Sequence, residues 1–258
     1  MQDINKCVLV TASSKGLGKA IVSEFAMNDY DVILHGRDEE KVIETKKEIE
    51  FDSIQYRNRT IDVSCIVGDL RSNDTIDELY KISKGKISVL VNNAAIPCYG
   101  LPLDEMDYMQ MIGSLHINLV TPIILTNRIY PLLKKQGYGS IININSIVGK
   151  EPKKFRSVHS AAKWGLKGFS KSLRIEASKY NVKVINVYPT QIKTVKEHTF
   201  GLEPYDVAQQ IYNEHITGDF KSELIIDGRP EEFRVLENGQ DDSQRCRYLH
   251  LIRGLRPA

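Results

Sequence analysis

The stretch VTASSKGLGKA occupies residues 10–20 and decides the fold, because it joins an apolar segment to a segment with helical periodicity. Residues 6–12 are mostly apolar and predict a buried strand, and Leu17, Ile21 and Phe25 then recur every four residues. Gly16 and Gly18 permit a tight turn and a close approach of backbone to a ligand. The helix behind them would present free N–H groups and a partial positive charge, so the stretch predicts a pyrophosphate site, although a plain strand-to-helix turn would also use glycine.

The same alternation of segments continues along most of the chain. Further apolar segments predict strands at residues 30–36, 61–70, 87–95, 140–149, 182–189 and 222–228. Between them, helical patterns cover residues 38–50, 74–83, 116–135, 160–180 and 204–216. Apolar strands separated by helices indicate a parallel sheet that is covered on both faces. We therefore predict an α/β fold with a single domain and a doubly wound, Rossmann-like parallel sheet, whose ligands bind beyond the carboxyl ends of the strands.

Composition argues against several classes of function. The chain has 258 residues, of which 41% are hydrophobic and 26% charged, as in an ordinary globular domain. Its net charge of +2 gives no reason to expect nucleic acid or an anionic membrane as a main partner. No apolar run approaches the roughly 20 residues of a membrane span. The N-terminus shows no secretory pattern and the four cysteines form no CxxC pair, so we expect a cytoplasmic protein without a metal site.

Two cations favour one nicotinamide dinucleotide over the other. Lys15 lies in the glycine loop, and Arg37 follows the second predicted strand. A cofactor with a free ribose 2′-hydroxyl prefers a carboxylate at that strand end, whereas a 2′-phosphate prefers an arginine. The two residues therefore predict NADP rather than NAD, unless both are solvated surface charges. Asp69 ends the third strand and is expected to meet the adenine amino group, unless it is only a turn residue.

Several motifs, in order along residues 7–228, resemble those of the short-chain dehydrogenase/reductase family. The family loop TGxxxGxG is matched by TASSKGLG, with Ala12 at the first glycine, and the NNAG motif by NNAA at residues 92–95. The helix asparagine is matched by Asn118 and the PGxxxT segment by PTQIKT at residues 189–194. The resemblance implies these cofactor-binding residues: Thr11, Ser13, Ser14, Lys15, Gly16, Leu17, Gly18, Arg37, Asp69, Leu70, Asn92, Ala94, Lys163, Pro189, Ile192 and Thr194.

The catalytic motifs of the family are matched with one change. Ser146 matches the catalytic serine, and HSAAK at residues 159–163 matches the YxxxK motif, so His159 stands where the family has its proton-donating tyrosine. In the family, the lysine holds the nicotinamide ribose, the serine orients the substrate oxygen and the asparagine supports a water-linked proton relay. The resemblance thus implies Ser146, His159, Lys163 and Asn118 as catalytic residues of an NADP-dependent oxidoreductase that interconverts a hydroxyl and a carbonyl.

The histidine leaves several functions open. An imidazole titrates near ~6.5, and the Lys163 ammonium one helical turn away should lower that pKa. Neutral imidazole is a fair base but a poor acid, so oxidation should be easier than reduction. The alternatives are an NADP-binding protein with a structural or sensing role, a non-redox lyase or epimerase with His159 as base, an inactivating change at 159, and proton donation by Tyr99 or Tyr108.

Other expectations concern partners and the C-terminus. The substrate is expected to be small or carrier-linked, and Lys193, Lys196 and His198 would either attract an anionic group or form a solvated face. The resemblance implies a homodimer or homotetramer. Residues 229–258 hold six of the thirteen arginines and no lysine, which distinguishes them from the domain at 1–228. They are expected to form an extension packed on the domain or on a neighbouring subunit, or to be foreign to the fold.

Overall fold

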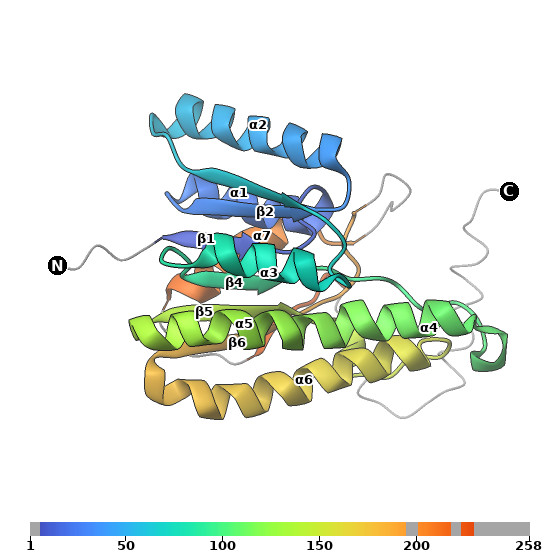
Figure 1. Cartoon of the computed structure of the whole chain (residues 1–258). Helices are drawn as coiled ribbons and strands as arrows, with labels where there is room; N and C mark the ends of the chain where they lie inside the picture. The colour runs from blue at the N-terminus through green and yellow to red at the C-terminus, as the bar shows by residue number, and fades with distance from the viewer. Residues whose placement is uncertain (1–5, 195–200, 218–222, 230–258) are drawn as a thin grey trace, which may run out of the picture. The chain divides into compact units, whose positions relative to one another are not determined.

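The computed structural model describes residues 6–194, 201–217 and 223–229, and its centre is one parallel sheet. The sheet has seven strands in the order β3-β2-β1-β4-β5-β6-β7, and every neighbouring pair is parallel (Figure 1). The strands are β1 (Cys7–Val10), β2 (Asp31–Gly36), β3 (Val63–Val67), β4 (Val89–Asn92), β5 (Gly139–Ile144), β6 (Val182–Pro189) and β7 (Glu223–Ile226). The chain reverses its direction across the sheet between β1 and β4, so the predicted doubly wound fold is confirmed.

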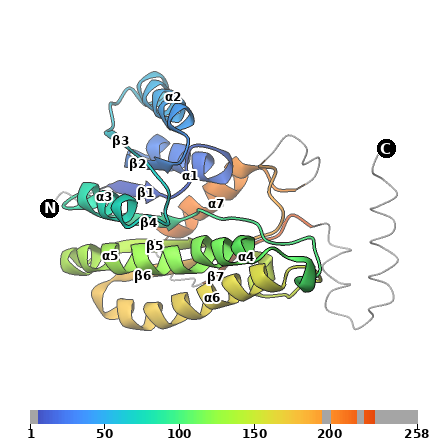
Figure 2. The same ribbon diagram turned by 45° about the vertical axis from the view of Figure 1, so that its right-hand side comes forward.

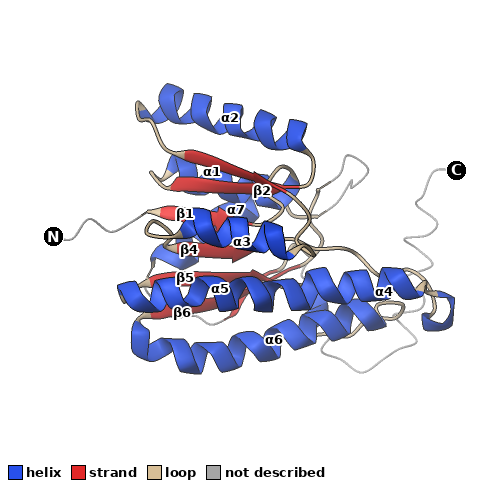
Figure 3. Ribbon diagram, viewed as in Figure 1, coloured by secondary structure: helices blue, strands red, loops and turns tan. Residues whose placement is uncertain are grey.

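Helices cover both faces of the sheet, and alternate residues of each central strand enter two separate cores (Figure 2, Figure 3). Val8 and Val10 of β1 pack with helices α1 (Gly16–Met27), α2 (Glu39–Arg57) and α7 (Pro204–Ile216). Leu9 packs on the other side with α3 (Asn73–Ser83), α5 (Thr121–Gln136) and α6 (Ser157–Ala177). Burial on both faces explains why the strands are continuous apolar runs in the sequence.

Of the predicted elements whose bounds differ in the structure, three lie near the candidate site. The predicted helix at residues 116–135 begins earlier, as α4 (Tyr108–Leu115), and passes through a π-helical turn at His116–Val120 before α5. The strand predicted at 140–149 ends at Ile144, because Asn145 and Ser146 turn the chain into a short 3₁₀ turn. Helix α6 begins at Ser157, which places His159 in its first turn. Each difference lies at the carboxyl edge of the sheet, where side-chain hydrogen bonds compete with regular structure.

The helical run Tyr108–Gln136 is long and apolar enough to cross a membrane by length and composition alone, contrary to the expectation from the sequence. Its apolar character has a structural reason within the fold. Leu125, Ile129 and Leu133 are fully buried against the sheet, and the last turn carries Lys134 and Lys135. A helix that covers a buried sheet passes the same test, so the run gives only weak evidence for a membrane.

Candidate functional site

The loop between β1 and α1 is built to leave backbone N–H groups free. Ala12 and Gly16 both adopt left-handed backbone conformations, with φ of +53° and +55°. A Cβ atom on Gly18 would lie 2.3 Å from the Ala12 carbonyl oxygen, so only glycine fits there. Lys15 caps α1 without a side-chain hydrogen bond, and the first turn holds no acidic residue. The first N–H groups of α1 therefore suit an anion such as a pyrophosphate.

His35 fixes this loop from the neighbouring strand. Its side chain is buried, Nδ1 accepts a hydrogen bond from the Ala12 N–H at 3.1 Å, and Nε2 donates to the Gly68 carbonyl at 3.1 Å. Because a backbone N–H can only donate, these two bonds require the neutral tautomer with its proton on Nε2. Burial lowers the pKa of His35 to about 4, which keeps this tautomer at neutral pH. Sequence reasoning missed His35, since a histidine in an apolar strand gives no motif.

We expect His35→Phe to lower the free energy of unfolding by about 3 kcal/mol, because it leaves the Ala12 N–H and the Gly68 carbonyl without partners. His35→Gln, which offers both an acceptor and a donor, should lose less than about 1 kcal/mol. Urea unfolding at pH 7.5 measures both values. Equal losses in the two variants would show that shape, and not hydrogen bonding, holds the loop.

A second set of bonds joins the loop to the end of β4. Thr11 Oγ1 accepts hydrogen bonds from the Asn93 and Ala94 N–H groups at 2.9 and 3.0 Å. Asn93 Nδ2 donates to the carbonyls of Thr11 and Ala12. The Ser13 hydroxyl is buried and bonds the backbone of His35. Thr11 and Ser13, both predicted as cofactor contacts, thus use their side chains to shape the loop.

The other predicted cofactor residues are divided between buried positions and more accessible ones. Asn92 lies in a buried chain of amides, where its Nδ2 donates to Asn143 Oδ1 at 2.8 Å, and Leu70 and Pro189 are buried as well. Ser14 and Lys15 remain on the loop, Lys15 being exposed, and Ala94 lies half-buried after β4. Thr194 comes close to Gly16: a Cβ on that glycine would lie 3.3 Å from Thr194 Cγ2. The segment that holds Ile192 and Thr194 therefore closes against the loop.

The two residues predicted to select the cofactor differ in their contacts. Arg37 is exposed just after β2, and no described carboxylate pairs with it. Asp69 is paired instead with Arg71, at 2.6 Å between Oδ2 and Nη2, and that hydrogen-bonded pair lowers the pKa of Asp69 to about 2. Arg37 is thus free to meet a phosphate, whereas Asp69 already has a cationic partner.

Lys163 lies in the middle of the candidate catalytic cluster. It is only 2% exposed, and its Nζ donates a hydrogen bond to the Ile144 carbonyl at 2.9 Å. Burial lowers the pKa of Lys163 to about 8. Asn145 links this helix to Ser146: its Oδ1 accepts from the Ser146 N–H at 2.9 Å and its Nδ2 donates to the Lys163 carbonyl at 3.1 Å. Asn145 is a positioning residue that the motif comparison did not single out.

His159 lies one turn before Lys163 on α6 and is 7% exposed. Its Nδ1 is buried and has no hydrogen-bond partner among the described residues. The ring packs edge-on against Tyr99, with centroids 5.6 Å apart. Burial, and then the positive charges of Lys163 and Arg156, lower the pKa of His159 to about 4. The predicted effect of Lys163 is present, but desolvation is the larger cause.

Asn118 lies in the π-helical turn, a feature often found at functional sites. Its Nδ2 donates to the Ile96 carbonyl at 2.6 Å and to the Ser114 carbonyl at 2.9 Å. Its Oδ1 is buried without a partner among the described residues. An acceptor of this kind would suit a relay water, which is the role that the resemblance implies for Asn118.

Of the three residues expected to attract an anion near the lid, Lys193 pairs with Glu203 at 2.7 Å. Lys196 and His198 lie outside the described residues, as do residues 230–258 of the predicted extension. Within the described part of the chain, no cluster of three or more His, Cys, Asp or Glu side chains is placed to hold a metal ion.

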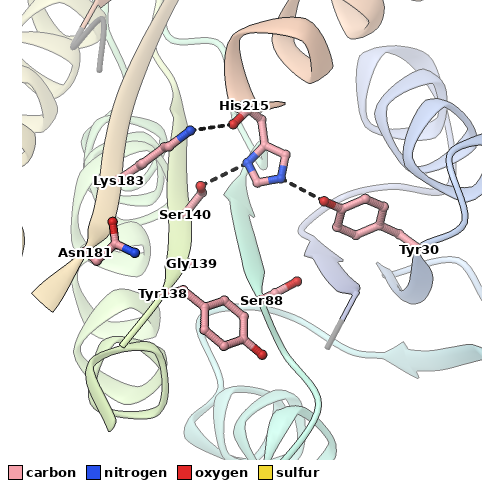
Figure 4. Close-up of a pocket in the computed structure, with 8 residues that line it drawn as sticks. All are labelled: Tyr30, Ser88, Tyr138, Gly139, Ser140, Asn181, Lys183 and His215. Carbon is pink, nitrogen blue, oxygen red and sulfur yellow. Dashed lines mark hydrogen bonds between the residues drawn. The ribbon is translucent and has the colours of Figure 1, made fainter. Parts of the chain in front are cut away.

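A cavity of about 150 Å³ lies at the opposite edge of the sheet, where β5 and β6 begin (Figure 4). His215 of α7 lines the cavity and makes two hydrogen bonds there: Nδ1 with Ser140 Oγ at 2.9 Å and Nε2 with Tyr30 Oη at 3.0 Å. Lys183 Nζ donates to the His215 carbonyl at 2.8 Å. These bonds fasten α7 to β5 and β6, so the cavity belongs to the scaffold and not to the site at the carboxyl edge.

Comparison with known proteins agrees with this geometry. A family model described as short chain dehydrogenase matches residues 6–202. Human dehydrogenase/reductase SDR family member 4 is 29% identical over 74% of this chain and 67% of its own length. For 3-ketodihydrosphingosine reductase of Bos taurus the identity is 25%, over 86% of this chain and 71% of that protein.

Solved structures extend the similarity to three dimensions. A metagenomic short-chain oxidoreductase in complex with NADP is 27% identical, with a TM-score of 0.75 over 87% of this chain and 98% of that one. The loop, the buried lysine and the serine turn described above therefore lie in a fold shared with that oxidoreductase. The chain belongs to the short-chain dehydrogenase family of oxidoreductases.

Proposed function

We propose that the protein is an NADP(H)-dependent oxidoreductase that interconverts a hydroxyl and a carbonyl group, with His159 as the proton-transfer residue. The observation that carries this proposal is the orphaned Nδ1 of buried His159, one helical turn from buried Lys163. When bound, the nicotinamide would supply or accept the hydride. Lys163 would hold the ribose, Ser146 would orient the substrate oxygen, and His159 would move the proton at that oxygen.

A panel assay tests this function. NADPH oxidation is followed with small ketones at pH 6, and NADP reduction with the matching alcohols at pH 8. Turnover in the wild type that falls at least 100-fold in Ser146→Ala supports the proposal. Cofactor binding with no turnover in either direction would favour the second candidate, a nucleotide-binding protein with a structural or sensing role. The observation that favours this second candidate is the low pKa of His159, about 4, because the imidazole is then neutral at pH 7 and has no proton to give to a carbonyl oxygen.

The cofactor preference gives a separate prediction. NADPH should bind the wild type at least tenfold more tightly than NADH, because the free guanidinium of Arg37 would pair with the 2′-phosphate. Arg37→Ala should lose this preference, whereas Arg59→Ala, a matched change of an exposed arginine beside Asp29, should keep it. Fluorescence titration measures the six affinities, of three proteins for two cofactors. Equal binding of the two cofactors by the wild type would remove the case for NADP.

A further inference from the structure

Arg156 is a cation beside His159 in the candidate site. Arg156 comes directly before α6, one turn from His159, and its guanidinium carbon lies 4.4 Å from the centre of the Tyr99 ring. His159 packs against the same ring from its edge. Tyr99 therefore lies against both Arg156 and His159.

Arg156 has no counter-charge within the described part of the chain. Lys150 and Lys193, by contrast, each have an acidic partner: Lys150 pairs with Glu223 at 2.7 Å, and Lys193 pairs with Glu203. No described carboxylate pairs with Arg156, and its guanidinium lies over the Tyr99 ring. The groups that face His159 are thus two cations, Arg156 and Lys163, and the neutral Tyr99. An excess of positive charge around a buried, unpartnered imidazole calls for an anion.

We propose that the substrate carries a carboxylate or phosphate close to its reacting carbon, and that Arg156 binds this anion beside His159. The inference rests on the proposed function and adds the substrate class. A guanidinium held over a tyrosine ring keeps its planar face fixed and its N–H groups free for a bidentate contact. The bound anion would also offset the two cations, which makes imidazolium easier to form at His159 exactly when a carbonyl oxygen needs a proton.

Matched acid and ester probes test the anion directly. They are 4-oxopentanoate, phenylglyoxylate and 2-oxopropylphosphonate, each beside its uncharged ester (methyl esters of the two carboxylates and the dimethyl ester of the phosphonate), assayed with NADPH. The wild type should prefer the acids at least tenfold in kcat/KM. Arg156→Ala should lose about 30-fold on the acids and less than threefold on the esters, with Arg156→Lys between them. Lys154→Ala, which removes an exposed lysine stacked on Phe155, is the matched control and should behave as wild type.

A second measurement does not depend on turnover. In NMR titrations of the NADP-loaded protein, 4-oxopentanoate should raise the pKa of His159 by about one unit, and its methyl ester should not. His35 and His215 serve as internal references, and His159→Phe assigns the signal.

Esters reduced as well as acids, or equal losses on both in Arg156→Ala, would overturn the anion site while leaving the proposed function intact. If no probe is turned over, the proposed function fails, and the NMR titration alone tests the anion site. A pKa shift of His159 in wild type that is lost in Arg156→Ala supports the anion site. No shift in wild type rejects the anion site.

Discussion

Carbonyl reduction by the wild-type protein should slow about tenfold for each pH unit between pH 5.5 and 8, whereas alcohol oxidation should stay constant over the same range. The reason is the pKa of His159, lowered to about 4 by burial, Lys163 and Arg156. Above that pKa the fraction of imidazolium, which is the acid for reduction, falls tenfold per pH unit. Nearly all of His159 is then already in the neutral form that serves as the base for oxidation. The profile is read from kcat/KM, which reports the free enzyme.

Three variants at position 159 complete this test. His159→Ala should lower turnover by 100- to 10,000-fold in both directions, as expected for loss of a general acid and base. In His159→Tyr the reduction profile should become flat, because a phenol with a pKa near ~10 stays protonated. Its turnover should nevertheless fall, since His159 is 7% exposed and packs against Tyr99, so a larger ring must displace that residue. His159→Phe controls for ring size without a proton.

Three results would contradict this mechanism. A rate of carbonyl reduction that is flat from pH 5 to 9 in wild type, or a turnover that is unchanged in His159→Ala, would show that the histidine carries no proton. A rise in turnover for His159→Tyr would show instead an ordinary reductase site that has lost its acid.

Acid should also destabilise the protein, by about 4 kcal/mol between pH 7.5 and 5.5. Three histidines cause the loss: burial lowers the pKa values of His35, His159 and His215 to about 4 each. The unfolded chain takes up protons near pH 6.5, while the folded chain does not until about pH 4, so the unfolded state binds more protons in this window and stability falls as the pH falls. By pH 4 the total loss reaches about 10 kcal/mol, comparable with the whole stability of a domain.

Urea unfolding at fixed protein concentration measures this dependence. Carboxylates with lowered pKa values, such as Asp69 at about 2, begin to contribute only below about pH 4, so the window from 7.5 to 5.5 isolates the histidines. His215→Gln should remove about a third of the loss, and it leaves the candidate active site untouched. Stabilities that agree within about 1 kcal/mol at the two pH values would show that the imidazoles are accessible to protons in the folded protein.

The fold could be predicted from the sequence, because a strand that is buried on both faces of a sheet is a continuous apolar segment of the sequence. Val8, Leu9 and Val10 belong to two different cores, yet all three are apolar, and this pattern distinguishes a parallel sheet from a half-exposed one. The turn of Gly16 before α1 and the placement of His159 and Lys163 one turn apart on α6 also agree with the sequence, because each depends on local spacing; the roles of Ser146, His159 and Lys163 stay predictions. Element ends could not be predicted equally well: α6 begins three residues before the expected residue 160, and its N-cap residue Arg156 makes no side-chain capping bond that would mark the start.

Only the tertiary structure decided which chemistry surrounds these residues. The contact of His35 with the Ala12 N–H and the contact of Tyr99 with both Arg156 and His159 join segments far apart in the chain, so no local pattern announces them. The pKa of His159 likewise depends first on desolvation, a property of packing that the sequence does not contain. The sequence by itself placed a histidine at position 159, where the resemblance implies a tyrosine; only the fold showed that this histidine is buried and close enough to Lys163 and Arg156 for both charges to lower its pKa, because burial and charge act through space and not along the chain.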